Sequence, residues 1–211
     1  MVEEIMIKPG VFYYPEYFNR TIQEEVRDEI LSYANELGWF QPTLPRWGTP
    51  FSVKMLNYGP LGWVSDKSGY RYQPTHPENG AVWRPFPLHM SRVWSSLNDG
   101  FDSPEACLIN YYHANARMGL HQDRDEQDLS VPVISVSLGD TALFRIGTTD
   151  RKGPTQSLKL KSGDVLVFGG PARLDFHGID RIYPGTSTLL PEGGRINLTL
   201  RRVTLLISMQ K

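Results

Sequence analysis

The stretch RINLTLR, residues 195–201, alternates strictly between polar and apolar side chains. Because neighbouring side chains of a β-strand point to opposite faces, the alternation predicts a strand with one polar and one apolar face. If the apolar face packs on a second layer, Arg195, Asn197, Thr199 and Arg201 point into a barrel interior. Two guanidiniums in such an interior need anionic partners. At ~20 Å apart along the strand they cannot share one carboxylate directly, but their long side chains can close on the two ends of a small dicarboxylate.

The chain before this stretch carries further short strand patterns, interrupted by glycine, aspartate and proline. Several short strands at this spacing predict a sandwich or jelly-roll core. The expected strands are one beginning at Ala106, then Val131–Leu138, Thr141–Gly147, Ser157–Lys161, Asp164–Phe168, Leu174–His177 and, last, Arg195–Val203.

Two segments have helical spacing of apolar residues. Residues 21–24 match a capping box, and the pattern that follows predicts a helix over about residues 22–37, ended by Gly38. A second helix is expected over residues 88–98, ended by Asp99-Gly100. Both helices are expected to support the sheet, and residues 1–17 to form an edge strand or arm.

The composition narrows the class of protein. The chain has 211 residues, enough for one domain with a sizeable core. Its net charge of −1 does not indicate non-specific nucleic-acid binding, so a polyanion would have to meet a local patch. The single cysteine, Cys107, argues against a disulfide framework and a cysteine-based zinc site, and fits a reducing cytosol. We find no signal peptide and no apolar run of ~18 residues, so we expect a cytoplasmic protein that does not enter the membrane. We expect a monomer, because the sequence shows no exposed apolar stripe.

Residues 39–87 are dense in proline, glycine and aromatic residues and show no long helical period. Short strands are expected at residues 51–56 and 69–73. The segment interleaves aromatic and basic residues, namely Trp63, Tyr70, Tyr72 and Trp83 with Lys54, Lys67, Arg71 and Arg84. Such a pattern suits a nucleic-acid surface, with rings for the bases and charges for the phosphates. It also fits a hairpin that packs on the core, and the segment alone leaves both interpretations open.

The stretch LHQDRDE, residues 120–126, places His121, Asp123 and Asp125 two positions apart. In an extended segment these three side chains share one face. An imidazole and a carboxylate supply two of the three protein ligands of a facial Fe(II) site. The candidate third ligand is His177, at the end of an expected strand, where Gly178 allows the backbone to turn. Zinc could use the same three residues for hydrolysis.

The arginine-bearing strand favours iron over zinc, because a zinc hydrolase leaves the two arginines unexplained. A dicarboxylate beside an iron held by two imidazoles and one carboxylate is what 2-oxoglutarate chemistry requires. Asn110 and Tyr112, two positions apart on an expected inner strand, could supply further hydrogen-bond donors. The keto acid and O₂ take the positions left open on the metal, and the reaction yields succinate and CO₂.

Together these motifs resemble the AlkB family of Fe(II)/2-oxoglutarate-dependent dioxygenases. The resemblance covers about residues 45–202 and rests on segments 61–63, 69–70, 106–110, 120–126, 132–139, 162–165, 169–170, 177–179 and 195–201. It implies a mixed α/β, mainly β, single domain over residues 1–211. The implied parts are an N-terminal extension with a support helix (1–44), a nucleotide-recognition lid (45–87), a second support helix (88–105) and a double-stranded β-helix, or jelly-roll, catalytic core (106–203).

The family also implies roles for individual residues. His121, Asp123 and His177 match the iron ligands, while Asn110, Tyr112, Arg195, Asn197 and Arg201 match the 2-oxoglutarate pocket. The substrate positions match Trp63, Tyr70, Asp125, Arg151 and Met55, with Trp63 stacking on the alkylated base opposite His121 and Asp125 facing its exocyclic amine.

The resemblance implies oxidative demethylation of 1-methyladenine- and 3-methylcytosine-type bases in DNA, with release of formaldehyde. This is direct repair of alkylation damage, and RNA is a further candidate substrate. The lid tip, with Pro50 and Phe51, differs from that of the bacterial repair enzyme, so no preference for single or double strands follows. Two alternatives stay open. The same iron chemistry could act on a protein or small molecule, or the chain could be a non-catalytic β-barrel that binds an anion or nucleic acid.

Overall fold

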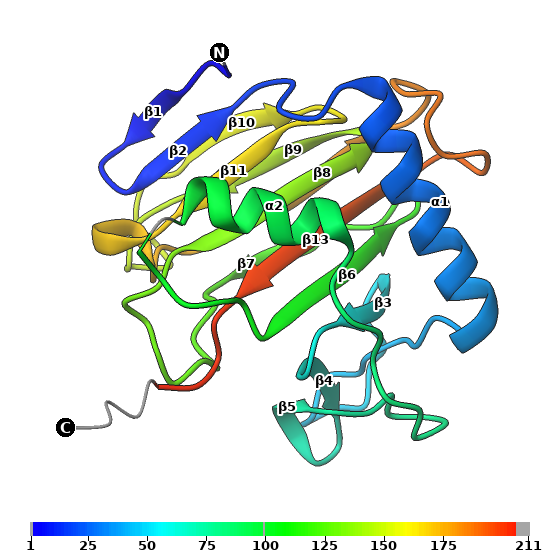
Figure 1. The fold of residues 1–211 in the computed structure, drawn as a ribbon. Coiled ribbons are helices and arrows are strands. Elements are labelled where there is room, and N and C mark those ends of the chain that lie inside the picture. Colours follow the sequence, from blue (N-terminus) through cyan, green and yellow to red (C-terminus); the bar gives the residue numbers. More distant parts are fainter. Residues whose placement is uncertain (1, 99, 206–211) are drawn as a thin grey trace, which may run out of the picture.

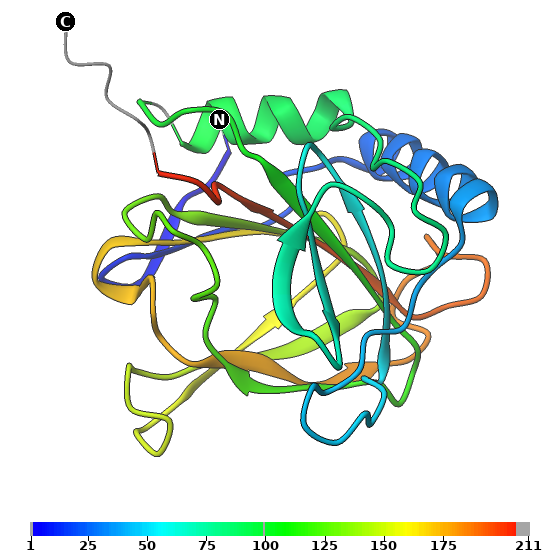
Figure 2. The same cartoon turned by 90° about the horizontal axis from the view of Figure 1, so that it is seen from below.

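The computed structural model describes residues 2–98 and 100–205, whose strands form two facing antiparallel sheets with a small hairpin sheet at one end (Figures 1 and 2). Within these residues the larger sheet has seven strands, in the order β1 (Ile5–Lys8), β2 (Val11–Tyr14), β11 (Val165–Phe168), β8 (Val133–Gly139), β13 (Arg195–Arg201), β6 (Ala106–Tyr112) and β3 (Val53–Tyr58). The smaller sheet has the order β10 (Gln156–Leu160), β9 (Thr141–Ile146), β12 (His177–Tyr183) and β7 (Met118–His121). The hairpin pairs β4 (Gly62–Asp66) with β5 (Gly69–Gln73). The expected jelly-roll core, mainly β, is confirmed.

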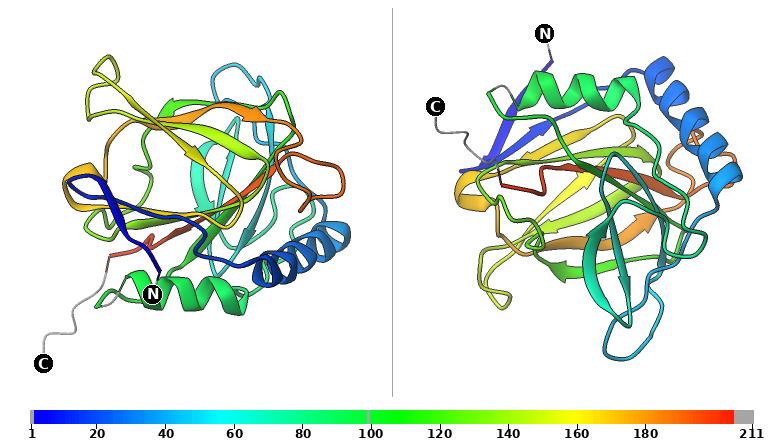
Figure 3. Two further views of the ribbon diagram at one scale, coloured as in Figure 1. Left: turned by 90° about the horizontal axis from the view of Figure 1, so that it is seen from above. Right: turned by 60° about the horizontal axis from the view of Figure 1, so that its bottom comes forward.

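Two helices, α1 (Arg20–Leu37) and α2 (Leu88–Leu97), cover the outer face of the larger sheet, and the smaller sheet lies on its other side (Figure 3, left). The capping-box prediction at residues 21–24 is wrong, because the side chain of Asn19 caps α1 by accepting from the Ile22 amide at 3.0 Å. Asp99, expected to end the second helix, lies outside the described residues. Neither helix of the described chain is both long and apolar enough to span a bilayer.

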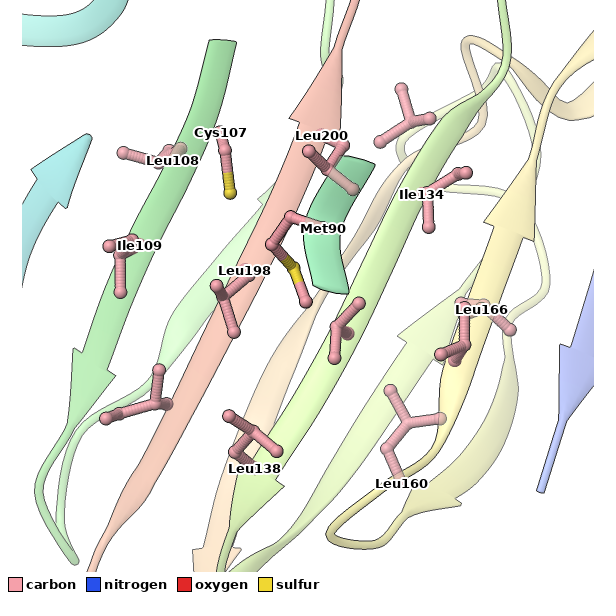
Figure 4. Close-up of a cluster of buried hydrophobic side chains, with 14 of the residues drawn as sticks. Met90, Cys107, Leu108, Ile109, Ile134, Leu138, Leu160, Leu166, Leu198 and Leu200 are labelled. Carbon is pink, nitrogen blue, oxygen red and sulfur yellow. The ribbon is translucent and has the colours of Figure 1, made fainter. Parts of the chain in front are cut away.

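Strand β13 lies between β6 and β8 in the middle of the larger sheet. Its apolar side chains, Ile196, Leu198 and Leu200, are completely buried. Figure 4 shows Met90 of α2 over Leu198 and Leu200. Burying each of these side chains contributes roughly 1.5–3 kcal/mol, which fixes the register and turns the polar face of β13 toward the smaller sheet.

Apart from shifts of one or two residues at strand ends, the predicted strands differ from the structure in three places. Leu174–His177 is not a strand, because the chain turns through a 3₁₀ segment (Gly170–Ala172) and β12 only begins at His177. Strands β7 and β4 were not predicted; β7 has only four residues, one of them Gly119, so it shows little alternation. The expected N-terminal arm is the β1–β2 hairpin, which extends the edge of the larger sheet through β11.

Candidate metal and cosubstrate site

The three predicted metal ligands meet at one point. His121 and His177 are register partners on β7 and β12, so their imidazoles lie side by side, with ring centroids 4.6 Å apart. Strand β7 ends at His121, so the extended-segment argument was wrong for Asp123, which enters from the following loop. Its Oδ1 is 3.8 Å from His121 Nε2, and its Oδ2 is 3.9 Å from His177 Nε2. One ligand atom from each residue lies within 4.8 Å of the other two.

Gly178 allows this approach, though for a reason other than the predicted turn. A Cβ atom at this position would lie 2.5 Å from the backbone oxygen of Met118 and 2.9 Å from that of Gly119. Both atoms belong to β7, so a side chain at position 178 would push β12 away from β7. The glycine therefore keeps His177 against His121.

Hydrogen bonds orient both imidazoles. Nδ1 of His121 lies 2.9 Å from the Gly119 carbonyl, and Nδ1 of His177 lies 3.0 Å from the Asp175 carbonyl. A carbonyl can only accept, so each Nδ1 carries the proton and each Nε2 lone pair points to the shared centre. Burial and the neighbouring His121 lower the pKa of His177 to about 4, so this ring is neutral near pH 7. Two imidazoles whose Nε2 atoms face one centre, together with one carboxylate, are the donor set of a facial Fe(II) site.

Asp123 is also fixed by Arg201, whose Nε and Nη2 donate to its Oδ2 at 3.1 and 2.8 Å. Burial alone would raise the pKa of Asp123, but Arg201 and the two histidines hold it well below its usual range. The carboxylate is therefore ionised and ready for a cation. Arg201, which was predicted to hold only the cosubstrate, already has this protein partner.

Arg195 has a different environment at the other end of β13. Its side chain is 1% exposed, and Nη2 donates to Ser137 Oγ at 3.0 Å. Its Nε and Nη1 find no partner within the described part of the chain. Burial lowers the pKa of Arg195 to about 10, so it is charged near pH 7. A buried guanidinium with two nitrogens that lack a partner fits one carboxylate of a dicarboxylate such as 2-oxoglutarate.

The other predicted cosubstrate residues lie on the same interior face. Asn110 and Asn197 are register partners on β6 and β13, as are Tyr112 and Arg195. The amide of Asn197 donates to Ser135 Oγ at 2.8 Å and to the Val136 carbonyl at 2.9 Å. Its amide hydrogens are therefore already bound within the protein, which suits a residue that shapes the pocket. Among the described residues, the Oδ1 atom of Asn110 has no partner.

One cavity of about 510 Å³ includes every residue predicted for metal, cosubstrate or substrate. At its mouth, Trp63 and Tyr70 of the β4–β5 hairpin, the part of the expected lid that we call the lid below, stack with ring centroids 5.6 Å apart and an interplanar angle of 18°. Trp63 Nε1 donates to Asp125 Oδ2 at 2.8 Å, which joins this hairpin to the loop that carries the candidate ligand Asp123. Arg151 stands at the rim with its guanidinium 5.7 Å from the centre of the Phe176 ring.

Three residues of the site were not predicted. Glu126 accepts a hydrogen bond from the hydroxyl of Tyr72 on β5, and its Oε2 forms an ion pair with Arg173 Nη2 at 3.1 Å. Glu126 lies within the quoted stretch 120–126, and Tyr72 among the lid aromatics, so both were visible in the sequence. Nothing in the sequence pattern distinguishes Arg173.

Comparisons with known proteins agree with this geometry. Residues 10–201 match the family model described as the 2OG-Fe(II) oxygenase superfamily. The alpha-ketoglutarate-dependent dioxygenase AlkB homolog of Caulobacter vibrioides is 48% identical over 202 residues, which cover 96% of this chain and 91% of that protein. AlkB of Escherichia coli is 38% identical over 183 residues, covering 85% and 84%. The solved structure of OsALKBH1 superposes with a TM-score of 0.80 at 31% identity, covering 95% of this chain and all of that one.

Two more distant relatives carry names that describe nucleic-acid demethylases. The DNA N(6)-methyladenine demethylase ALKBH1D of Arabidopsis thaliana is 44% identical over 109 residues, covering 47% of this chain and 25% of that protein. The tRNA demethylase abh1 of Schizosaccharomyces pombe is 36% identical over 143 residues, covering 65% and 47%. From its fold, its donor set and these matches, the chain belongs to the AlkB family of Fe(II)- and 2-oxoglutarate-dependent dioxygenases.

Proposed function

We propose that this dioxygenase removes N-methyl groups from the Watson–Crick edge of adenine and cytosine in DNA, as in 1-methyladenine and 3-methylcytosine, with RNA carrying the same lesions as a further candidate substrate. The observation that carries the proposal is the lid. Two stacked aromatic rings and a carboxylate, Asp125, stand at the mouth of the cavity that contains the His121–Asp123–His177 cluster.

The lid chemistry suits a methylated, cationic base. An aromatic ring such as that of Trp63 attracts a cation, and Asp125 adds an opposite charge. One Asp125 oxygen is bound by the indole N–H, which leaves the other to accept from an exocyclic amine. A base methylated on its Watson–Crick edge pairs poorly, so turning it out of a strand costs less than for a normal base. Met55, buried on β3, and Arg151, which is exposed, line the same cavity.

The protein holds the reacting groups and keeps water out. His121, Asp123 and His177 would hold Fe(II) through two nitrogens and one carboxylate, and Arg195 would bind one carboxylate of 2-oxoglutarate. Arg201, Asn110, Tyr112 and Asn197 would orient the keto acid from β13 and β6. When bound, Fe(II) and 2-oxoglutarate use O₂ to hydroxylate the methyl group, with release of succinate and CO₂. The hydroxymethylated base then loses formaldehyde without a protein nucleophile, so the chain contributes placement rather than acid–base chemistry.

A single experiment tests the proposal. The protein is loaded anaerobically with Fe(II) and 2-oxoglutarate and mixed with oligonucleotides carrying 1-methyladenine or 3-methylcytosine as single-stranded DNA, duplex DNA or RNA. After air is admitted, formaldehyde and demethylated base are measured. We expect demethylation of the DNA substrates, and comparison of the three forms gives the strand preference. If iron-loaded protein demethylates none of them while still oxidising 2-oxoglutarate, the substrate is of another class.

A further inference from the structure

Two neighbouring acids in the loop after β7 hold the two strands of the lid. Trp63 of β4 and Tyr72 of β5 are register partners, so their side chains lie on the same face of the hairpin. Trp63 donates to Asp125, and Tyr72 donates its hydroxyl to Oε1 of Glu126. The lid is therefore tied to the loop that carries Asp123 by one contact at the proposed nucleotide slot and by a second beside it.

Glu126 belongs to a buried cluster of two acids and two arginines, made of Asp123, Glu126, Arg173 and Arg201. Its Oε2 is 3.1 Å from Arg173 Nη2, and its Oε1 is 3.5 Å from Arg201 Nε. Arg173 also donates from Nη1 to the backbone oxygen of Asp123 at 2.5 Å. Each of these four residues is at most 7% exposed, so water screens their charges weakly. The partner of each group therefore depends on what the others bind.

Tyr72 and Arg201 approach the same oxygen of Glu126. While Oε1 accepts the Tyr72 hydroxyl, Arg201 Nε stays 3.5 Å away and donates to Asp123 Oδ2 at 3.1 Å instead. Without the hydroxyl, Oε1 would be a buried oxygen lacking its best donor, and Arg201 is a cation within reach. Because an unsatisfied buried acceptor is unfavourable, Arg201 would shift toward Glu126 and away from Asp123 and the cosubstrate.

We propose that Glu126 is a positioning residue through which the lid sets the side chain of Arg201. A nucleotide that orders the lid strengthens the Tyr72–Glu126 contact, keeps Arg201 on the side of Asp123 and 2-oxoglutarate, and so tightens 2-oxoglutarate binding. The inference rests on the proposed function, because it requires a nucleotide at the lid. By thermodynamic reciprocity, 2-oxoglutarate tightens nucleotide binding by the same factor. Oxidation of 2-oxoglutarate is thereby favoured when a target base is present.

The test measures the coupling factor directly. Binding of 2-oxoglutarate is followed by calorimetry with Mn(II) in place of Fe(II) under anaerobic conditions, with and without a saturating 1-methyladenine oligonucleotide. We expect the oligonucleotide to tighten 2-oxoglutarate binding to the wild type about tenfold, a usual size for coupling between two sites. In Tyr72→Phe and in Glu126→Gln the factor should fall below about twofold. In turnover, both variants should form more succinate per formaldehyde than the wild type.

Tyr111→Phe is the matched control. It also removes a tyrosine hydroxyl that donates one hydrogen bond, to the Gly193 carbonyl at 3.3 Å, and neither residue lines the cavity. In this variant the oligonucleotide should tighten 2-oxoglutarate binding by the same factor as in the wild type. If Glu126→Gln does not fold, as shown by its thermal melt, Tyr72→Phe still tests the proposal because it removes a single oxygen atom.

The outcomes separate the two proposals. A general loosening of the pocket would weaken 2-oxoglutarate binding equally with and without oligonucleotide, and an unchanged factor in Tyr72→Phe would overturn the role of Glu126. No coupling in the wild type would also overturn it. If the wild type demethylates no methylated oligonucleotide, the proposed function itself fails, whereas demethylation with equal factors in wild type and variants rejects only the role of Glu126.

Discussion

Arg201 donates two hydrogen bonds to a single oxygen of Asp123, from Nε at 3.1 Å and from Nη2 at 2.8 Å. The same oxygen, Oδ2, faces His177 Nε2, while Oδ1 faces His121 Nε2. One carboxylate therefore joins the two histidines to the strand that carries both arginines. A change at Asp123 alters the metal donor set and also leaves a buried guanidinium without its partner.

Asp123→Ala should abolish turnover and metal binding. Loss of an outer partner of a metal ligand typically weakens affinity or activity about 10- to 100-fold, and loss of the ligand itself should exceed that. The unpaired Arg201 should also destabilise the fold by about 3–5 kcal/mol. Formaldehyde release, Mn(II) titration and thermal melts measure the three effects. Asp128→Ala, in the same loop, removes a carboxylate that binds Ser130 and should leave metal affinity unchanged. Normal activity of Asp123→Ala would refute the metal assignment.

Arg195→Met should make the protein without ligand more stable. It should also abolish the rise in melting temperature that 2-oxoglutarate causes. Replacing an unbalanced buried charge with an apolar side chain of similar length is often stabilising by about 1–4 kcal/mol. The wild type should gain thermal stability when 2-oxoglutarate is added, because a ligand that binds only the folded state raises its melting temperature. The measurement is the melting temperature of both proteins with and without 2-oxoglutarate. A methionine variant that still responds like the wild type would show that Arg195 does not bind the keto acid.

Trp63→Ala should weaken binding of the methylated oligonucleotide more than it lowers the maximal rate. Stacking of one base on an aromatic ring contributes about 1–3 kcal/mol, or roughly a 5- to 150-fold change in dissociation constant. Trp63→Phe is the informative partner, because it keeps an aromatic ring, although a smaller one, and loses the N–H that binds Asp125. It should retain most of the affinity. Equal losses in the two variants would mean that the hydrogen bond to Asp125, and not stacking, holds the nucleotide.

The stability of the metal-free protein should fall as the pH drops from 6.5 toward 4. An unfolded histidine takes up a proton near pH 6.5, whereas the pKa of buried His177 is about 4. Between these values the unfolded state binds the extra proton, so stability is fully present above about pH 6.5 and decreases by up to ~3 kcal/mol on the way to pH 4. Denaturant titrations in the presence of a chelator measure this slope. His177→Gln should flatten it, and an unchanged slope would show that His177 is not the group responsible.

The sequence predicted those strands whose register is fixed by the burial of one apolar face. The alternation of residues 195–201 predicted both the position of β13 between two layers and the face that lines the cavity. The grouping of His121, Asp123 and His177 followed from the types of these three residues. Its geometry did not, because Asp123 lies beyond the end of β7 and its direction depends on Arg201 and on the backbone contact with Arg173.

Contacts between distant segments were the part that residue patterns could not predict. The Tyr72–Glu126 contact joins residues 54 positions apart, and the Arg173–Glu126 pair joins residues 47 apart. Neither spacing has a period that a strand or helix would impose. The same holds for Gly178, whose role depends on the backbone of β7, a strand that the sequence did not predict.

Strand β13 is made after every other described strand, yet it belongs in the middle of the larger sheet. Before residues 195–201 leave the ribosome, β1, β2, β11 and β8 can form one half-sheet and β6 and β3 another, each with an open edge. Open edges invite pairing with other chains, so the nascent protein is vulnerable to aggregation until synthesis has passed Arg201. The same event that closes the sheet also delivers both guanidiniums to the cavity. The fold thus prevents a half-made chain from presenting a complete oxidation site.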